Sequence, residues 1–476
     1  MTLAQKTITG IIWNFAEQIG RKGIGVVITL LLARFLVPAD YGLVAMMAIF
    51  LAVANSLMDS GFKQALIRLQ EAKQVDFNTA FYANLCLGAL SYFLLFLVAP
   101  FVADFYNEPR LVTLIRVAGL SIPINAFQVV QVAILSRDLN FKVQLQATIP
   151  AGIISGVIAV GLAYAGLGVW ALIAQMHLAA LITTVFLWWI QGWRPTQEVS
   201  RQTLGNMYNF GYKLFLSGLL DTIFQNIYVI VIAKMFTASI AGHYFFANKL
   251  KDLVLQQFVS SIQNVTYPAL ASLQADDKRL KEGYRKVIQV TTFVLFPAML
   301  FMAALAEPLF KVLLPEKWLP AVPYLQLMCF AGVFYPLHSI NLNILQVKGR
   351  SDLFLYLEII KKIMVLVILI VSFKYGVIGI LIGQVIVSVL AYVPNSYFSA
   401  KLINYPVQEQ MADFIPGLAL SGAVSLAVYA SAYYLQWPAL AELIVLASAG
   451  GLLYLAGAHI LKLQACCLAL QMLKKK

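Results

Sequence analysis

Apolar runs of about 20 residues recur along the whole chain, and short polar joints separate them. A helix needs about 20 apolar residues to cross the hydrocarbon core of a bilayer, where every backbone polar group must be paired internally. The runs lie near 8–32, 41–60, 79–101, 111–134, 144–165, 167–190, 210–233, 242–264, 287–306, 322–346, 353–373, 377–400, 411–432 and 439–460. They predict an all-α polytopic membrane protein with about fourteen transmembrane helices.

The composition agrees with this class, because 61% of the residues are hydrophobic and only 12% are charged. Soluble globular proteins have about 25% charged residues. The net charge of +13 favours basic cytoplasmic joints over a nucleic-acid partner, since Lys and Arg gather on the cytoplasmic side of membrane proteins. The four cysteines have no zinc-ligand spacing, so they predict neither a metal site nor a disulfide framework.

The placement of Lys and Arg predicts the orientation. With the N-terminus in the cytoplasm, the cytoplasmic joints and tails hold about twenty Lys and Arg, and the opposite joints hold six. Both termini are therefore expected in the cytoplasm. The longest joints lie near 61–78, 191–209 and 271–286 on this side, and the longest outer turn lies near 307–321. No joint is long enough for a soluble domain, which argues against an enzyme that works at the outer face.

Helix ends are expected where proline interrupts the apolar pattern. Three joints have this form: Leu36-Val37-Pro38, Asn107-Glu108-Pro109 and Leu314-Pro315-Glu316. Proline pushes the preceding residue out of helical geometry, so a boundary is predicted at each. The first apolar run is longer than the core of a signal peptide and has no small-residue cleavage site, which predicts a retained first span.

Charged side chains inside the predicted spans form the main candidate site. Eight are basic: Arg21, Lys22, Arg116, Lys213, Lys249, Lys251, Lys361 and Lys362. Four are acidic: Glu17, Asp221, Asp252 and Glu358. A charge at the bilayer centre costs roughly 3 kcal/mol or more unless it faces protein or water. These side chains are therefore expected to line an interior.

Two interpretations of these charges stay open. Residues three or four apart share a helix face, so Glu17 with Arg21 and Glu358 with Lys361 or Lys362 can form ion pairs that only stabilise packing. Some cations, Lys213 and Arg116 among them, can also extend to the membrane interface. The surplus of basic over acidic side chains instead predicts a cationic, water-filled cavity for an anionic substrate, with an acid as the coupling group.

A short repeat in the sequence indicates two related halves. Ala33-Arg34 and Gly42 recur as Ala233-Lys234 and Gly242, an offset of 200 residues. Parallel repeats of six spans keep the same orientation, as the charge count requires. The chain is predicted to consist of an N-lobe at 1–200, a C-lobe at 201–402, and two further helices with a basic tail at 403–476.

Several sequence segments, by their order and spacing, resemble those of a known family of membrane proteins. They follow predicted spans 1, 2, 4 and 8: Leu32-Ala33-Arg34-Phe35-Leu36 with Asp40-Tyr41-Gly42, Gly61-Phe62-Lys63-Gln64-Ala65-Leu66-Ile67-Arg68, Leu135-Ser136-Arg137-Asp138-Leu139-Asn140-Phe141-Lys142, and Tyr267-Pro268-Ala269-Leu270-Ala271-Ser272-Leu273-Gln274. The chain is similar to the Wzx-like polysaccharide transporters of the multidrug/oligosaccharidyl-lipid/polysaccharide (MOP) exporter superfamily, near the colanic-acid and exopolysaccharide branch. The resemblance covers nearly the whole chain.

This resemblance implies a flippase. Two lobes would face a central cavity, and an oligosaccharide on undecaprenyl pyrophosphate would pass from the inner to the outer leaflet by alternating access. The implied location is the bacterial inner membrane, and the implied energy source is H⁺ or Na⁺ antiport or the substrate gradient, without a bound cofactor. The polymerase and chain-length machinery are the expected protein partners, and a monomer is favoured.

Three other functions are weighed against this one. A drug or cation antiporter of the same superfamily would need acids in its cavity, which the basic surplus disfavours. A membrane glycosyltransferase, polymerase or ligase would need a catalytic loop outside the membrane. A non-transporting assembly scaffold would leave the charges in the spans unexplained.

Overall fold

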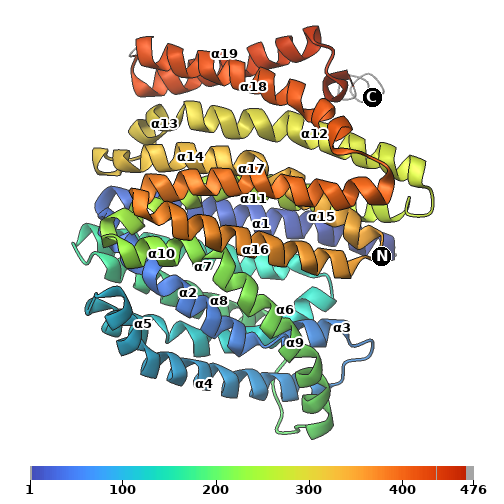
Figure 1. Cartoon of the computed structure of the whole chain (residues 1–476). Helices are drawn as coiled ribbons and strands as arrows, with labels where there is room; N and C mark the ends of the chain where they lie inside the picture. The colour runs from blue at the N-terminus through green and yellow to red at the C-terminus, as the bar shows by residue number, and fades with distance from the viewer. Residues whose placement is uncertain (1–2, 436, 468–476) are drawn as a thin grey trace. The chain divides into compact units, whose positions relative to one another are not determined.

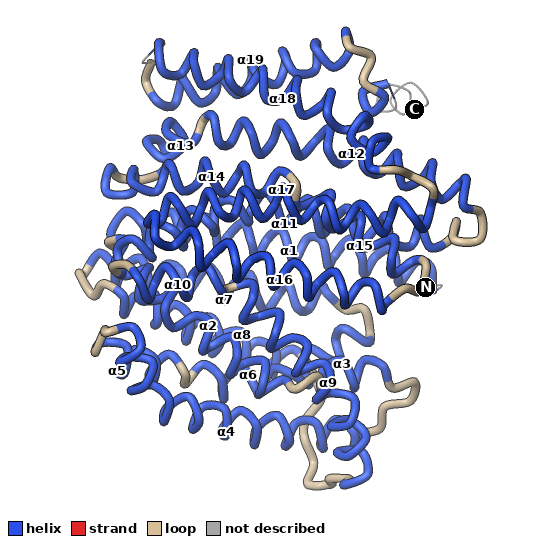
Figure 2. Tube along the Cα trace, in the orientation of Figure 1, coloured by secondary structure: helices blue, strands red, loops and turns tan. Residues whose placement is uncertain are grey.

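The computed structural model describes the backbone of residues 3–435 and 437–467, with all their side chains except those of 3–12, 15, 210, 213, 214, 257, 260–265 and 267–269. This part of the chain consists of helices and loops, as Figure 2 shows. The predicted all-α fold is confirmed.

The chain forms two compact units that divide between Gly242 and His243. The first contains α1 (Leu3–Phe35), α2 (Pro38–Asp59), α3 (Phe62–Arg68), α4 (Gln74–Tyr106), α5 (Arg110–Ala118), α6 (Ser121–Arg137), α7 (Phe141–Tyr164), α8 (Val169–Ile190), α9 (Arg201–Gln225), α10 (Ile227–Met235) and the start of α11 (Ala238–Ala271). The second contains the rest of α11, then α12 (Asp277–Ala304), α13 (Ala306–Leu313), the 3-10 helix η1 (Glu316–Ala321), α14 (Val322–Val333), α15 (Tyr335–Val347), α16 (Ser351–Ser372), η2 (Phe373–Tyr375), α17 (Gly376–Ile403), α18 (Val407–Leu435) and α19 (Ala439–Ile460). The predicted division into lobes at 200 and 402 stays a prediction.

Each predicted span corresponds to helix, and the last one, 439–460, agrees with α19 residue for residue. Among the described residues, 10 helical segments are long and apolar enough to cross a membrane, or up to 11 if the bent pair α9–α10 is one span. One of these segments, Ser351–Ile403, contains both α16 and α17. The count of fourteen therefore stays a prediction, and the polytopic class is confirmed.

Three predicted spans are each broken into two helices. The breaks lie at Gly119-Leu120, at Asn226 and at Phe334. At Asn226 the parts Phe215–Gln225 and Ile227–Met235 meet at an angle of 47°. The Asn226 amide donates to the carbonyl of Thr222 at 2.8 Å, so a side chain competes there for a backbone acceptor.

The proline joints end helices as predicted. Helix α1 ends at Phe35, and α2 begins at Pro38, where the missing N–H of proline costs no helical hydrogen bond. The Asp40 carboxylate accepts from the backbone N–H of Val37 at 3.1 Å and completes the cap. After α4, Asn107 adopts φ +54°, a left-handed conformation that asparagine tolerates.

The polar joints contain more helix than the sequence pattern predicts. Short helix α3 fills much of the joint 61–78, and α13 and η1 replace the outer turn near 307–321. Helices α9 and α12 begin at Arg201 and Asp277, well before their apolar parts. A helix does not stop where its composition becomes polar, because its exposed turns are stable wherever they are capped.

Arg137, at the end of α6, caps the short helix α3. Its guanidinium donates to the backbone carbonyls of Leu66 at 2.5 Å, of Ile67 at 3.4 Å, and of Leu69. The last carbonyls of a helix have no partner within the helix, so they need such donors. One side chain from α6 therefore fixes the end of α3.

The junction between α1 and α2 is repeated in the junction between α10 and α11. Helices α1 and α10 end at residues 35 and 235, and α2 and α11 begin at residues 38 and 238. A Cβ atom on Gly42 would lie 1.8 Å from the Ala238 carbonyl oxygen, and one on Gly242 would lie 1.8 Å from that of Pro38. The starts of α2 and α11 therefore contact each other reciprocally through Gly42 and Gly242. The glycines that recur at an offset of 200 residues are thus the residues that permit this contact.

In the second unit, α18 and α19 lie alongside α12 and α13 (Figure 1). Helix α12 is the most central element of this unit, and it buries Tyr284, Ile288, Leu295, Phe296 and Met299 completely. Helices α15 and α17 contribute to the same core. This packing positions the polar groups of α11, α12, α15, α16 and α18 that are described below.

Candidate functional site

Glu17 and Arg21 on α1 form the predicted ion pair. Arg21 Nε lies 3.1 Å from Glu17 Oε1, one helical turn away. The Glu17 side chain is 11% exposed and the Arg21 side chain 60%. The buried partner thus holds one side of the guanidinium and leaves the rest accessible.

The exposed apolar residues of α1 show which way Arg21 points. Ile19, Val27 and Leu31 are exposed and recur every four or eight residues, so they form one stripe. Arg21 follows Ile19 by two residues, which is about 200° around a helix of 3.6 residues per turn. By the same count Arg21 is about 120° from Val27 and about 80° from Leu31, so its guanidinium lies to one side of the apolar stripe.

The other predicted site residues of the first unit are not part of this ion pair. Lys22 is half-buried and makes a polar contact. The Arg116 guanidinium lies 4.0 Å from the centre of the Phe96 ring on α4. Asp221 is exposed on α9 and also makes a polar contact. The side chain of Lys213 lies outside the described residues.

In the second unit, three side chains of α11 form a closed polar group. Lys251 Nζ lies 3.2 Å from Asp252 Oδ1 and donates to Asn248 Oδ1 at 2.8 Å. The Asn248 amide donates to Asp252 Oδ2 at 3.1 Å. The sequence places Lys249 and Asp252 on one face, and the ion pair forms with Lys251 instead; Lys249 is exposed and has a polar contact of its own.

Helix α16 carries the second group. Lys361 Nζ and Glu358 Oε1 form an ion pair, and the Lys361 side chain is 18% exposed. Ile359, Ile363 and Ile370 mark the exposed apolar face of α16, and Lys361 follows Ile359 by about 200° of helix rotation. Lys361 therefore points away from that face, and Lys362 is half-buried at its flank.

Residues of α15 and α17 connect these two groups. The carboxylates of Asp252 and Glu358 both act electrostatically on the hydroxyl of Tyr335, at the start of α15. One turn further on, His338 Nδ1 lies 3.0 Å from the Asn395 amide of α17. No spacing pattern in the sequence singles out His338. His338 also lies within electrostatic range of Lys361 on α16.

Three of the predicted cations thus pair with three of the predicted acids: Arg21 with Glu17, Lys251 with Asp252, and Lys361 with Glu358. Part of the basic charge is thus neutralised locally. The formal excess of the eight cations over the four acids remains. In the second unit Lys249 and Lys362 lie next to the two pairs in the sequence, and both make polar contacts of their own.

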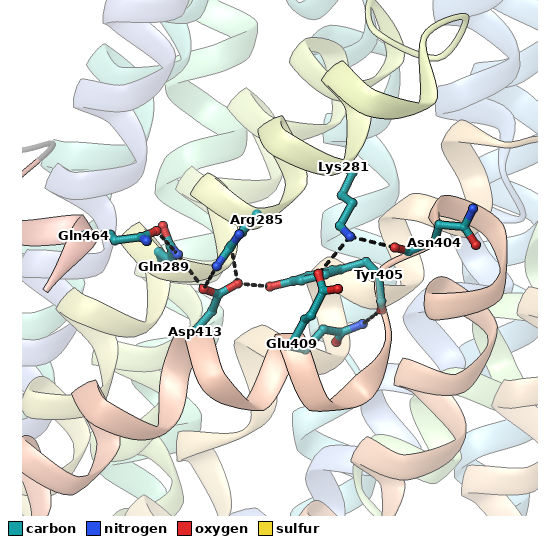
Figure 3. A network of polar contacts seen from close by, with 9 residues as sticks. Lys281, Arg285, Gln289, Asn404, Tyr405, Glu409, Asp413 and Gln464 are labelled. Carbon is teal, nitrogen blue, oxygen red and sulfur yellow. Dashed lines mark hydrogen bonds and ion pairs between the residues drawn. The ribbon is translucent and has the colours of Figure 1, made fainter.

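A further polar network, which the sequence did not reveal, lies at one end of α12 (Figure 3). Asp413 of α18 accepts from Arg285 Nε at 2.6 Å, from Arg285 Nη2 at 2.7 Å and from Gln289 at 2.8 Å. The Tyr405 hydroxyl also donates to Asp413, and Gln289 donates to Gln464 at 2.7 Å. Arg285 and Asp413 are 128 residues apart in the sequence, so helical spacing could not predict their contact. Burial raises the pKa of Tyr405, which lies in the loop before α18, so its hydroxyl stays a donor.

Comparisons with known proteins decide the family. Residues 31–323 match the family described as polysaccharide biosynthesis protein. The chain belongs to this family. Lipopolysaccharide biosynthesis protein WzxC of Escherichia coli K12 is 24% identical over 401 residues, which cover 82% of this chain and 81% of WzxC. Succinoglycan biosynthesis transport protein ExoT of Rhizobium meliloti is 28% identical over 337 residues, which cover 70% of this chain and 68% of ExoT.

Solved structures show the same fold. The lipid II flippase MurJ, in an inward closed conformation, has a TM-score of 0.75 at 14% identity, and the match covers 95% of this chain and 98% of MurJ. An inward-facing multidrug resistance MATE transporter of the MOP superfamily has a TM-score of 0.61 at 18% identity, with 80% and 95% covered. The predicted resemblance to a family of polysaccharide biosynthesis proteins is confirmed by the match over residues 31–323, and these two structures show the fold.

Proposed function

We propose that this protein is a flippase that moves a lipid-linked oligosaccharide from the inner to the outer leaflet for the synthesis of a surface polysaccharide. The carrier would be undecaprenyl pyrophosphate. The observation that carries this proposal is the match to the polysaccharide biosynthesis family over residues 31–323. One relative, ExoT, is named as a transport protein, and that name supports transport rather than catalysis.

The proposal includes a location and an orientation. The protein resides in the bacterial inner membrane with both termini in the cytoplasm, which the excess of Lys and Arg in the corresponding joints supports. It acts as a transporter and not as an enzyme.

The basic side chains of α11 and α16 are the proposed contacts for the pyrophosphate. A pyrophosphate cannot cross hydrocarbon unaided, because burying an unpaired charge is far more costly than burying a polar group. Four lysines supply donors: Lys361 points away from the apolar face of α16 and Lys362 lies at its flank, whereas Lys249 and Lys251 lie on the polar part of α11. In the first unit, Arg21 and Lys22 supply the same chemistry. Arg116 and Lys213 stay predictions of the sequence.

The ion-paired acids are the proposed coupling groups. Protonation of Glu17, Asp252 or Glu358 would release Arg21, Lys251 or Lys361 from its pair and free that cation for the substrate. Proton or sodium exchange at the carboxylate could thereby be linked to substrate binding. Asp221 is the fourth acid of this set.

The test separates binding from a merely structural ion pair. In a strain that lacks the exporter, Lys361→Gln should abolish surface polymer and cause lipid-linked repeat units to accumulate on the inner leaflet. The double variant Lys361→Gln/Glu358→Gln removes both charges, so it should restore function only if Lys361 does no more than neutralise Glu358. We expect it to stay inactive at normal protein level, and Glu358→Gln alone shows how much of that loss comes from the proposed coupling acid.

The matched control uses the exposed pair of Lys311 and Glu307 on α13, whose charged atoms lie 2.7 Å apart. Lys311→Gln/Glu307→Gln changes the same two residue types and should keep normal polymer levels. Normal polymer from the Lys361→Gln/Glu358→Gln strain would refute the basic contact. Normal polymer in the strain that lacks the whole protein would refute the flippase itself.

A further inference from the structure

The charged ends of three helices meet in the second unit. Arg285 and Lys286 are the last charged residues before the apolar part of α12. Asp413 is the last charged residue before the apolar part of α18. Lys462 is the first Lys or Arg after α19. Helices α12, α18 and α19 pack together, and Arg285, Asp413 and Lys462 line one pocket, so these transitions from charged to apolar lie at one level. This is where a membrane helix passes from the hydrocarbon to the headgroup layer.

A divided cavity opens at this level. One part has a volume of about 280 Å³ and the other about 370 Å³, and Arg285, Gln289, Lys462 and Gln464 line both. Lys286 and Glu282 line the second part. The segment after α19 closes one side, because Gln464 is held by Gln289 (Figure 3).

The first part of the cavity is apolar away from the charges. Phe293 of α12, Pro416 and Gly417 of α18, and Leu461 and Leu463 after α19 line it. A Cβ atom on Gly417 would meet nothing within 4 Å, so the space beside it is open. The cavity therefore has a charged mouth and an apolar body.

The charge at the mouth is positive once the ion pair is counted. Asp413 is 4% exposed and is fully engaged by Arg285, Gln289 and Tyr405. Lys286 and Lys462 are exposed, and Glu282 is the remaining acid. Two lysines against one carboxylate favour an anion. Lys462 is held in place by its turn, where its φ is +49° and its N–H donates to the carbonyl of His459 at 3.1 Å.

We propose that this cavity binds one anionic phospholipid. Lys286 and Lys462 bind the headgroup phosphate at the mouth, with the outer edge of Arg285, and an acyl chain lies along Phe293, Pro416 and Leu461. Basic pockets between membrane helices at the headgroup level bind anionic lipids in this way. A free phosphate would use only the mouth, whereas a lipid also buries the apolar body. The lipid would bridge α12, α18 and the segment after α19, a role separate from that of the basic groups on α11 and α16.

The test uses the purified full-length protein in detergent. Thermal unfolding is followed while phosphatidylglycerol, phosphatidylcholine or inorganic phosphate is added, and lipid binding is counted by native mass spectrometry. Phosphatidylglycerol should stabilise the protein, and the other two should not. Lys286→Gln/Lys462→Gln should weaken phosphatidylglycerol binding roughly fivefold for each lysine.

The control Lys278→Gln/Lys401→Gln removes the same charge from exposed residues near the same helix ends and should bind as wild type does. Equal losses in both double variants would show diffuse surface attraction and overturn the proposal. Equal stabilisation by phosphatidylcholine, or binding of inorganic phosphate as tight as that of the lipid, would overturn it as well.

A second variant keeps all the charges. Gly417→Leu places a side chain in the open apolar body, so phosphatidylglycerol binding should fall at least tenfold while net charge is unchanged. Unaltered lipid binding by this variant would overturn the assignment of the acyl chain, even if the lysine variant fails to fold.

Discussion

The reciprocal glycine contact between the starts of α2 and α11 can be tested directly. Gly42→Ala would place a methyl group 1.8 Å from the Ala238 carbonyl oxygen, where a carbon and an oxygen normally stay about 3.3–3.6 Å apart. The two helix starts would have to separate by roughly 1.5 Å. Overpacking of this kind costs about 1–3 kcal/mol, and Gly242→Ala should cost the same because its environment is equivalent.

Thermal unfolding of the purified variants measures this cost. For a unit the size of Met1–Gly242, each 1 kcal/mol lowers the midpoint by about 2–4 °C, so each single variant should lose roughly 2–12 °C. The double variant should lose less than the sum, because one separation of the helices relieves both clashes. Gly161→Ala is the matched control: its Cβ meets nothing within 4 Å, and alanine is the better helix former.

Two results would refute this reasoning. Midpoints of both single variants within about 1 °C of wild type would show that the helix starts do not touch as closely as described. Losses that add fully in the double variant would show that the two contacts are independent.

Three further predictions concern polar contacts. Asp413→Asn should lower stability by about 1–3 kcal/mol, less than for a fully buried pair because Arg285 is 41% exposed; unfolding in detergent checks this, and an unchanged midpoint would contradict it. Hydrogen bonds from Arg110 lower the pKa of Glu108 below its ordinary 4.5, so the pair stabilises above that pH and loses its effect as the pH falls through the lowered pKa. The free energy of unfolding of wild type should exceed that of Glu108→Gln by at most about 1 kcal/mol at pH 7, since Arg110 is 61% exposed. The two should converge as the pH falls below the lowered pKa of Glu108; a constant gap would contradict this. Arg137→Lys should speed proteolytic cleavage between residues 69 and 73, because an ammonium lacks the planar fork that reaches several carbonyls; equal cleavage rates would contradict this.

The membrane class and most helix ends could be predicted from the sequence, because an apolar run of the right length has few alternatives in a bilayer. The helix boundary at the joint that contains Pro38 could be predicted equally well. The break at Phe334 was missed although Pro336 follows it by two residues, and the break at Asn226 could not be predicted, since it interrupts an apolar run that contains no proline. There the bend depends on local side-chain bonding and tertiary packing, which a hydropathy pattern does not contain.

The candidate site was predicted in part. The ion pairs of Glu17 with Arg21 and of Glu358 with Lys361 follow from helical spacing, and both are present. The pairing of Lys251 rather than Lys249 with Asp252 depends on rotamers within one turn. The contact of Arg285 with Asp413 depends on which helices become neighbours, and helical periodicity describes only one helix at a time.

The capping of α3 by Arg137 has a consequence for biosynthesis. The last carbonyls of α3 are 68 to 71 residues upstream of the side chain that satisfies them. At a synthesis rate of about 5–20 residues per second, this interval lasts roughly 3–14 seconds. During it these carbonyls lack the donor that they have in the folded protein, because Arg137 has not yet been synthesised. The end of α3 is thus completed only after α6 has been made.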